Sequence, residues 1–189
     1  MKRILFGFSL FAASLGVAST ASAQDILVVD MQRVYSESKV GQHINARVKA
    51  FADSDSATLQ SRASSLEATG KSLQSQVQGK DVSAIRSNTA LTSQLTDFQK
   101  RQSELARDAQ KRSAELQLTQ AKARSEVNTR LRTIFDQIAR ERNASAVLEQ
   151  GAVLYLPNSS SADITSTVIQ RLDGQMTTVA VSRQSLPTQ

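Results

Sequence analysis

The chain contains no cysteine and a single histidine, His43. Without cysteine it has no disulfide bond, no thiolate ligand for a metal ion and no lipid-modified cysteine as a membrane tether. One histidine excludes multi-histidine metal sites and histidine-based triads, and we expect His43, next to the apolar Ile44, to be an exposed helix residue. Aromatic residues make up only 4% of the chain, too few to provide stacking platforms for bases, so nucleic acid is not an expected partner.

Glycine and proline, which most often interrupt helices, are also scarce. Neither occurs between Asp81 and Asn143, and from about Met31 onward the preceding stretch contains only three glycines: Gly41, Gly70 and Gly79. This pattern predicts two long helices joined near residues 79–81. Because a short turn places two such helices side by side, we expect an antiparallel helical hairpin over residues 31–143, with its tip near residues 72–88.

Apolar residues recur every three or four positions along both predicted helices. The first helix follows an 11-residue repeat, typical of nearly straight packing, and the second is closer to a heptad. Five residues interrupt the apolar stripes: Asp55, Arg62, Gly70, Gln102 and Arg112. A narrow, interrupted stripe predicts a hairpin that holds together but bends, with its weakest packing at the tip.

Short strand-like segments flank the hairpin. Ile26–Val29 is a β-branched run that predicts a buried strand, and Asp30 follows it as a helix N-cap. After the hairpin, residues 146–148 and 152–156 predict two further strands joined by a turn at residues 149–151. Asp163 is expected to cap a short helix that Gly174 ends, and residues 175–189 to be disordered.

Residues 24–30 and 144–174 thus predict a small β/α body, which is too small to enclose a core alone. Such scaffolds usually need oligomerisation. The fold class is therefore α+β, predominantly α: a long hairpin that projects from a body completed by other copies of the chain. The expected oligomer core consists of six apolar residues: Ile26, Val28, Val147, Val153, Leu154 and Leu156.

The first 23 residues have the three parts of a signal peptide. Lys2 and Arg3 precede an apolar run, Ile4–Val17, and a small-residue cleavage site follows at residues 21–23. The run is shorter than the ~20 residues that span a membrane, although an uncleaved anchor is the alternative. We expect cleavage after Ala23 and export, with a bacterial periplasm as the destination.

No glycine-rich phosphate loop, nucleophile elbow, zinc motif or calcium loop occurs in the sequence. We therefore expect no catalytic residue, no cofactor, no metal and no enzymatic activity. The hairpin is instead basic, with 17 Lys and Arg against 11 Asp and Glu from Ile44 to Ser145. A basic arm attracts anionic partners, although simple solubility is the alternative. The candidate contacts are Lys100, Arg101, Arg107, Lys111, Arg112, Lys122 and Arg124.

The order of these elements resembles the Skp (OmpH) family of periplasmic chaperones over roughly residues 25–172. The resemblance lies in residues 26–31, the helical hairpin, residues 152–155, and Asp163-Ile164-Thr165 before the last helix. It implies a homotrimer with a shared β-barrel body whose arms enclose unfolded outer-membrane β-barrel proteins without ATP. It also suggests lipopolysaccharide or an anionic membrane surface as a partner, with Lys111-Arg112-Ser113 as the nearest contact motif.

Two other functions compete with this one. A structural coiled-coil spacer or adaptor of the cell envelope would favour an uninterrupted Leu/Ile seam, which the polar residues on the stripe contradict. An enzyme would need a reactive cluster that the sequence lacks. A chaperone that holds unfolded proteins needs only modest apolar surface and a diffuse field.

Overall fold

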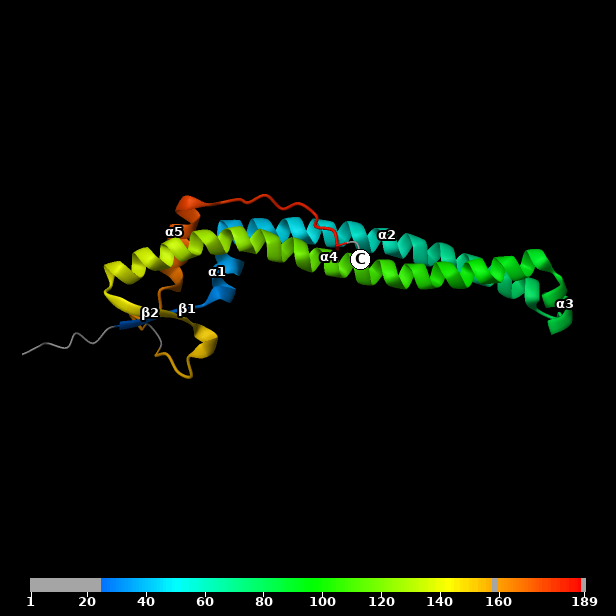
Figure 1. Cartoon of the computed structure of the whole chain (residues 1–189), viewed down its shortest axis with the longest axis horizontal. Coiled ribbons are helices and arrows are strands. Elements are labelled where there is room, and N and C mark those ends of the chain that lie inside the picture. The colour runs from blue at the N-terminus through cyan, green and yellow to red at the C-terminus, as the bar shows by residue number, and fades with distance from the viewer. Residues whose placement is uncertain (1–24, 158–159, 188–189) are drawn as a thin grey trace, which may run out of the picture.

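A computed structural model describes residues 25–157 and 160–187; the predicted signal peptide lies outside this range. Figure 1 shows a long helical hairpin that projects from a small body. The elements are, in chain order, β1 (Asp25–Val29), α1 (Met31–Glu37), α2 (Lys39–Val77), α3 (Val82–Ser87), α4 (Thr89–Glu141), β2 (Ala144–Glu149), the 3-10 turn η1 (Gln150–Ala152) and α5 (Thr165–Gln175). The predicted class, mainly helical with a small sheet, is confirmed.

Asp30 caps the first helix as expected, because its side chain accepts a hydrogen bond from the backbone N–H of Arg33. The sequence did not predict the break that follows at Ser38. There the Ser38 hydroxyl accepts from the N–H of Gly41, and the carboxylate of Asp173 in α5 accepts from the N–H of Lys39 at 2.8 Å. These bonds satisfy free amides at the start of α2, so the chain begins a second helix in a new direction.

The tip of the hairpin contains a turn and a short extra helix. Gly79 has a φ of +76°, a left-handed conformation that glycine adopts without strain. We expected the second long helix to follow this turn directly, but α3 intervenes and α4 begins only at Thr89. Asn88 is the reason, because its side chain accepts a hydrogen bond from the N–H of Leu91 and caps α4.

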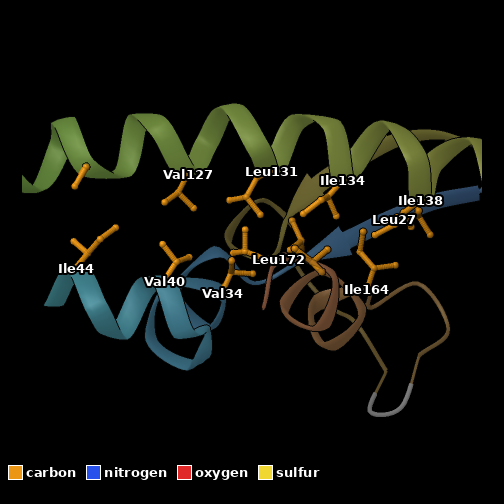
Figure 2. Close-up of a cluster of buried hydrophobic side chains, with 13 residues drawn as sticks. Leu27, Val34, Val40, Ile44, Val127, Leu131, Ile134, Ile138, Ile164 and Leu172 are labelled. Carbon is orange, nitrogen blue, oxygen red and sulfur yellow. The ribbon is translucent and has the colours of Figure 1, made fainter. Parts of the chain in front are cut away.

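The main apolar core lies where the hairpin joins the body. Figure 2 shows side chains of α4 facing side chains of α1 and α2, with β1 and α5 closing the other side. The fully buried members include Val34, Ile44, Val127 and Ile134, each at most 1% exposed. The arm is therefore anchored by the body, and packing thins out toward its tip.

The sheet has two strands, β1 and β2, which pair in parallel with Val29 opposite Glu149. The other edge of β1 is occupied by the segment before α5, since Val28 N–H donates to Ala162 and Val28 C=O accepts from Ile164. The predicted strand over residues 152–156 is wrong for the single chain. The N–H of Val153 instead donates to the carbonyl of Gln150 and closes η1, so the chain makes a tight turn where a strand hairpin was expected.

The tail that the sequence predicted to be disordered, residues 175–189, has a defined path over its described part. Helix α5 runs one residue past Gly174, and residues 176–187, here called the C-terminal segment, lie extended along the hairpin (Figure 1). Val179 and Val181 pack against the core from this segment. The sequence stripe could not reveal this, because a short extended segment has no helical period.

Candidate functional site

The described residues contain no cluster of His, Cys, Asp and Glu that could hold a metal ion. Within the same residues, no helix combines the length and apolarity needed to cross a membrane. Polar side chains gather instead on the seam between α2 and α4, at the positions where the apolar stripes are interrupted. A binding function would therefore use one of three surfaces: this seam, the groove beside it, or the exposed residues of the body.

Asp55 is the centre of the polar seam. It lies in α2, is only 4% exposed, and accepts a hydrogen bond of 2.5 Å from Nη1 of Arg112 in α4. Arg183 of the C-terminal segment binds the same carboxylate with both terminal nitrogens, at 2.8 and 3.0 Å. A buried carboxylate is stable only when such partners compensate for its lost hydration. Three separate stretches of chain therefore meet at one side chain.

The pairing continues along the arm. Arg112 also donates through Nε to Asp108, at 3.2 Å, and Asp108 accepts from Arg62 across the hairpin at 2.6 Å. We call these five residues the charge ladder: Arg183, Asp55, Arg112, Asp108 and Arg62. Three of the five residues that interrupt the apolar stripes, Asp55, Arg62 and Arg112, are thus cross-links between the helices. The stripe marked their positions, but only the structure shows how they pair.

The charges of the ladder stabilise one another's ionised forms. Hydrogen bonds from Arg183 lower the pKa of Asp55, burial opposes them, and hydrogen bonds from Arg112 add to the lowering. The hydrogen bonds to Asp55, followed by those to Asp108, raise the pKa of Arg112. Both shifts favour the charged forms of Asp55 and Arg112, so these two residues act in the ladder as a structural ion pair.

The C-terminal segment makes three further contacts with the hairpin. The guanidinium of Arg183 lies over the ring of Phe51, 5.1 Å from its centre. The N–H of Gln184 donates to the Thr119 hydroxyl of α4 at 2.9 Å. The ring Nε2 of His43 lies 3.2 Å from the carbonyl oxygen of Val179. His43 is therefore half-buried and not the exposed helix residue that the sequence suggested.

A shallow groove of about 490 Å³ runs along the seam beside the ladder. Small side chains and three leucines line most of it: Ala52, Ser56, Leu59, Ala63, Leu105, Ala109, Ser113 and Leu116. Asp55 and Arg112 of the ladder also line it, so the groove borders the carboxylate that Arg183 of the C-terminal segment binds. The groove is open, and no reactive group converges on it.

The seven basic residues proposed as anion contacts fall into two groups. Four form ion pairs within the arm: Lys100 with Glu104, Arg101 with Asp97, Lys111 with Glu115, and Arg112 with Asp55 and Asp108. The other three, Arg107, Lys122 and Arg124, make no ion pair among the described residues. Arg107 and Lys122 are exposed, so among the seven they are the cations with the least compensated charge.

Arg124 has a different environment from the other basic residues. Its guanidinium lies over the ring of Tyr35, 4.6 Å from the ring centre, and its Nε is buried with no hydrogen-bond partner in the described part of the chain. Burial raises the pKa of Tyr35, and the charge of Arg124 opposes this effect. Arg124 therefore packs at the base of the arm, where it supports the α1–α4 contact.

The charges of α4 also follow an 11-residue repeat, which the apolar stripe alone does not reveal. Lys100, Lys111 and Lys122 each precede a glutamate by four residues: Glu104, Glu115 and Glu126. Eleven residues make slightly more than three full turns of a helix, so the lysines recur on nearly the same face of α4. These charges therefore follow an 11-residue period on α4, beside the heptad-like period expected for its apolar stripe.

The six residues proposed for an oligomer core do not form one cluster in the single chain. Val28 is buried within the protomer, whereas Ile26 is 51% exposed. Val147, Val153 and Leu156 are half-buried, and Leu154 is completely exposed. Tyr155, which was not proposed, is also 78% exposed. Large apolar side chains of the body thus remain uncovered.

The comparison with solved structures supports this fold. A crystal structure of an OmpH-like protein from Caulobacter crescentus CB15, a candidate outer membrane chaperone solved at 2.83 Å resolution, superposes with a TM-score of 0.70. The match covers 98% of this chain and 100% of the other, at 24% sequence identity. No curated protein sequence matches this chain.

The family assignment is based on the sequence itself. The model of the family described as outer membrane protein (OmpH-like) matches residues 25–172, which include the body, the hairpin and most of α5. The matched range is the one over which the resemblance was noted. The chain therefore belongs to the OmpH-like family.

Proposed function

We propose that the protein is an ATP-independent periplasmic chaperone that holds unfolded outer-membrane proteins between its helical arms. The observation that carries this proposal is the arm itself. It is long, anchored at one end, and lined by a shallow groove of small and leucine side chains. A surface of this kind suits weak binding of many sequences, because it lacks a shaped pocket that would select one ligand.

In this proposal the protein is a homotrimer. Leu154 and Tyr155 are exposed large side chains on the body, and contiguous apolar surface of this kind marks interaction sites. Within the described residues, no strand pairs with the second edge of β2 or with residues 154–156, and pairing with other copies at these positions would complete a shared barrel. Trimerisation places three arms around one space.

Charge adds to the capture of clients. The uncompensated Arg107 and Lys122 on α4 produce a positive field that speeds encounter with acidic unfolded chains. Lipopolysaccharide and anionic membrane surfaces carry the same type of charge and are additional candidate partners. Export to the periplasm follows from the predicted signal peptide, and the family's outer-membrane description agrees with that destination.

The test is aggregation suppression. A urea-unfolded β-barrel protein is diluted into buffer with and without the chain that begins after Ala23, and light scattering follows aggregation and particle mass together. We expect suppression that saturates near one trimer per client. Full aggregation in the presence of excess protein, or retention of only folded partners, would contradict the proposal and favour an envelope spacer.

A further inference from the structure

The C-terminal segment alternates between buried and exposed residues along the hairpin. Val179, Val181 and Arg183 are half-buried, whereas Ala180 and Ser182 between them are exposed. A period of two is the pattern of an extended chain that packs one side against a surface. The segment is therefore docked on the arm by specific side chains.

Its polar anchors reach both helices of the hairpin. On α2 they are His43, which contacts the carbonyl of Val179, and Asp55, which binds Arg183. On α4 the anchor is Thr119, which accepts from the N–H of Gln184. Since the segment follows directly from α5, it connects the body to the arm across the seam.

The anchors farthest from the body, Asp55 and Thr119, lie where the packing between α2 and α4 changes. Between Asp55 and Leu73, α2 buries no residue, and α4 buries none between Leu91 and Glu115. On the body side of these limits, α4 alone buries six apolar or small polar residues: Thr119, Ala123, Val127, Leu131, Ile134 and Ile138. The segment covers the arm up to the point where the core ends.

We propose that the C-terminal segment is a strap that keeps the body-proximal part of the arm rigid and confines bending to the part beyond Asp55. Bending closer to the body would separate anchors on α2, α4 and the segment at the same time. Beyond Asp55, α2 extends for about 33 Å at 1.5 Å per residue. Among the described residues, the Arg62–Asp108 ion pair joins it to α4 there, but no hydrogen bond from the C-terminal segment reaches it. Local opening requires little free energy where few buried contacts resist it.

The first test establishes docking in solution. The chain contains no cysteine, so single cysteines report on their own surroundings. Val181→Cys is half-buried and the matched control Ala180→Cys is its exposed neighbour. We expect a thiol reagent to modify V181C about tenfold more slowly than A180C, because modification requires local undocking. Equal rates would overturn the proposal.

The second test measures rigidity by amide hydrogen exchange of the full assembly. Arg183→Ala removes the Asp55 contact, and Ser185→Ala is the control, because Ser185 is exposed and its side chain makes no hydrogen bond among the described residues. We expect R183A to raise exchange several-fold in residues 44–55 and 115–127 and to leave residues 62–73 unchanged. The S185A protein is expected to match the wild type.

A chain that ends after Met176 extends this test. We expect its residues 44–55 to exchange as fast as residues 62–73, provided that scattering shows an unchanged assembly mass. Unchanged proximal exchange in both R183A and this shortened chain would overturn the strap. Client binding is not used as a readout, so failure here is independent of the proposed chaperone function.

Discussion

Arg183 binds the carboxylate of Asp55 with both terminal nitrogens, although the two residues are 128 positions apart in the chain. Arg112 holds the same carboxylate from a third segment. A leucine seam would stabilise the hairpin in several neighbouring registers, whereas one buried carboxylate is satisfied only when its two partners are opposite it. The ladder thus fixes the register of a hairpin whose apolar stripe is narrow.

Asp55→Asn tests how much the contacts of Asp55 with Arg112 and Arg183 contribute to the stability of the fold. The amide keeps the shape of the carboxylate but loses its charge, which leaves Arg112 and Arg183 without their shared anion. We expect a loss of about 1–3 kcal/mol in the free energy of unfolding, measured by urea denaturation.

The control is Asp53→Asn. Asp53 is exposed, and within the described part of the chain its one ion pair is with Lys49, one turn earlier on the same helix. Exposed pairs of this kind contribute ~0–0.5 kcal/mol. Equal losses of unfolding free energy in D53N and D55N would show that the contacts of Asp55 contribute no more than an exposed surface pair.

The stability contributed by Asp55 should depend on pH in one direction. Its pKa in the folded protein is below the ordinary value of 3.8, mainly because of Arg183. The unfolded chain therefore takes up the proton at a higher pH than the folded chain does. The contribution is fully present above ~pH 4.5 and is lost as the pH falls through 3.8 toward the folded pKa. The measurement is the stability difference between wild type and D55N from pH 7 to pH 2.5; a difference that already shrinks between pH 7 and pH 5 would contradict this assignment.

Two glycine substitutions should have opposite effects. A Cβ atom on Gly41 would lie 2.1 Å from the carbonyl oxygen of Tyr35, which is backbone and cannot move aside. Nothing lies within 4 Å of a Cβ on Gly174 in α5. We expect Gly41→Ala to destabilise the fold by about 2–4 kcal/mol. Gly174→Ala should stabilise it by up to ~1 kcal/mol, because alanine favours helix. Thermal unfolding of the two variants checks the direction of each change in stability. An unchanged stability of G41A would contradict the close approach of Tyr35 to Gly41 at the Ser38 break.

The Gly41 contact illustrates which parts of the fold the sequence could predict. Local signals were sufficient for the Asp30 cap, the turn at Gly79 and the antiparallel hairpin, because each depends on neighbouring residues or on a sustained period. The close approach of Tyr35 to Gly41 follows from the break at Ser38. This break depends on Asp173, a partner far away in the sequence.

The site was predictable to a similar extent. Asp55, Arg62 and Arg112 stood out as polar residues on an apolar stripe, but their pairing required the alignment of α2 with α4. No sequence pattern pointed to the docking of the C-terminal segment. Its anchors are the carboxylate of Asp55 and the hydroxyl of Thr119, on helices that lie much earlier in the chain. The strand predicted at residues 152–156 is replaced in the single chain by the η1 turn, which the apolar residues of this stretch did not reveal.

Reversal of the uncompensated charges should slow client capture. In the double variant Arg107→Glu and Lys122→Glu, two exposed cations become anions on one face of α4. We expect the association rate with an acidic unfolded client to fall by roughly tenfold at low salt and by much less at ~0.5 M salt. Stopped-flow mixing measures both rates. A salt-independent decrease would instead indicate damage to the arm.

The exposed body residues give the last prediction, which concerns assembly. Leu154 is fully exposed and Tyr155 is 78% exposed in the single chain. In a shared body each would be buried, and burial of a leucine side chain contributes about 1.5–3 kcal/mol. A charge there opposes this burial, so Leu154→Asp or Tyr155→Asp should shift the mass measured by light scattering from the oligomer toward the monomer.

The control is Val82→Asp at the tip of the hairpin, because Val82 is 64% exposed but lies in α3, far along the arm from the body. V82D should keep the oligomer mass. Since the protomer core does not include Leu154 or Tyr155, all three variants should retain their helical content by circular dichroism. An unchanged oligomer in L154D and Y155D would place the interface elsewhere on the body, whereas monomers with intact helices would assign it to residues 154–155.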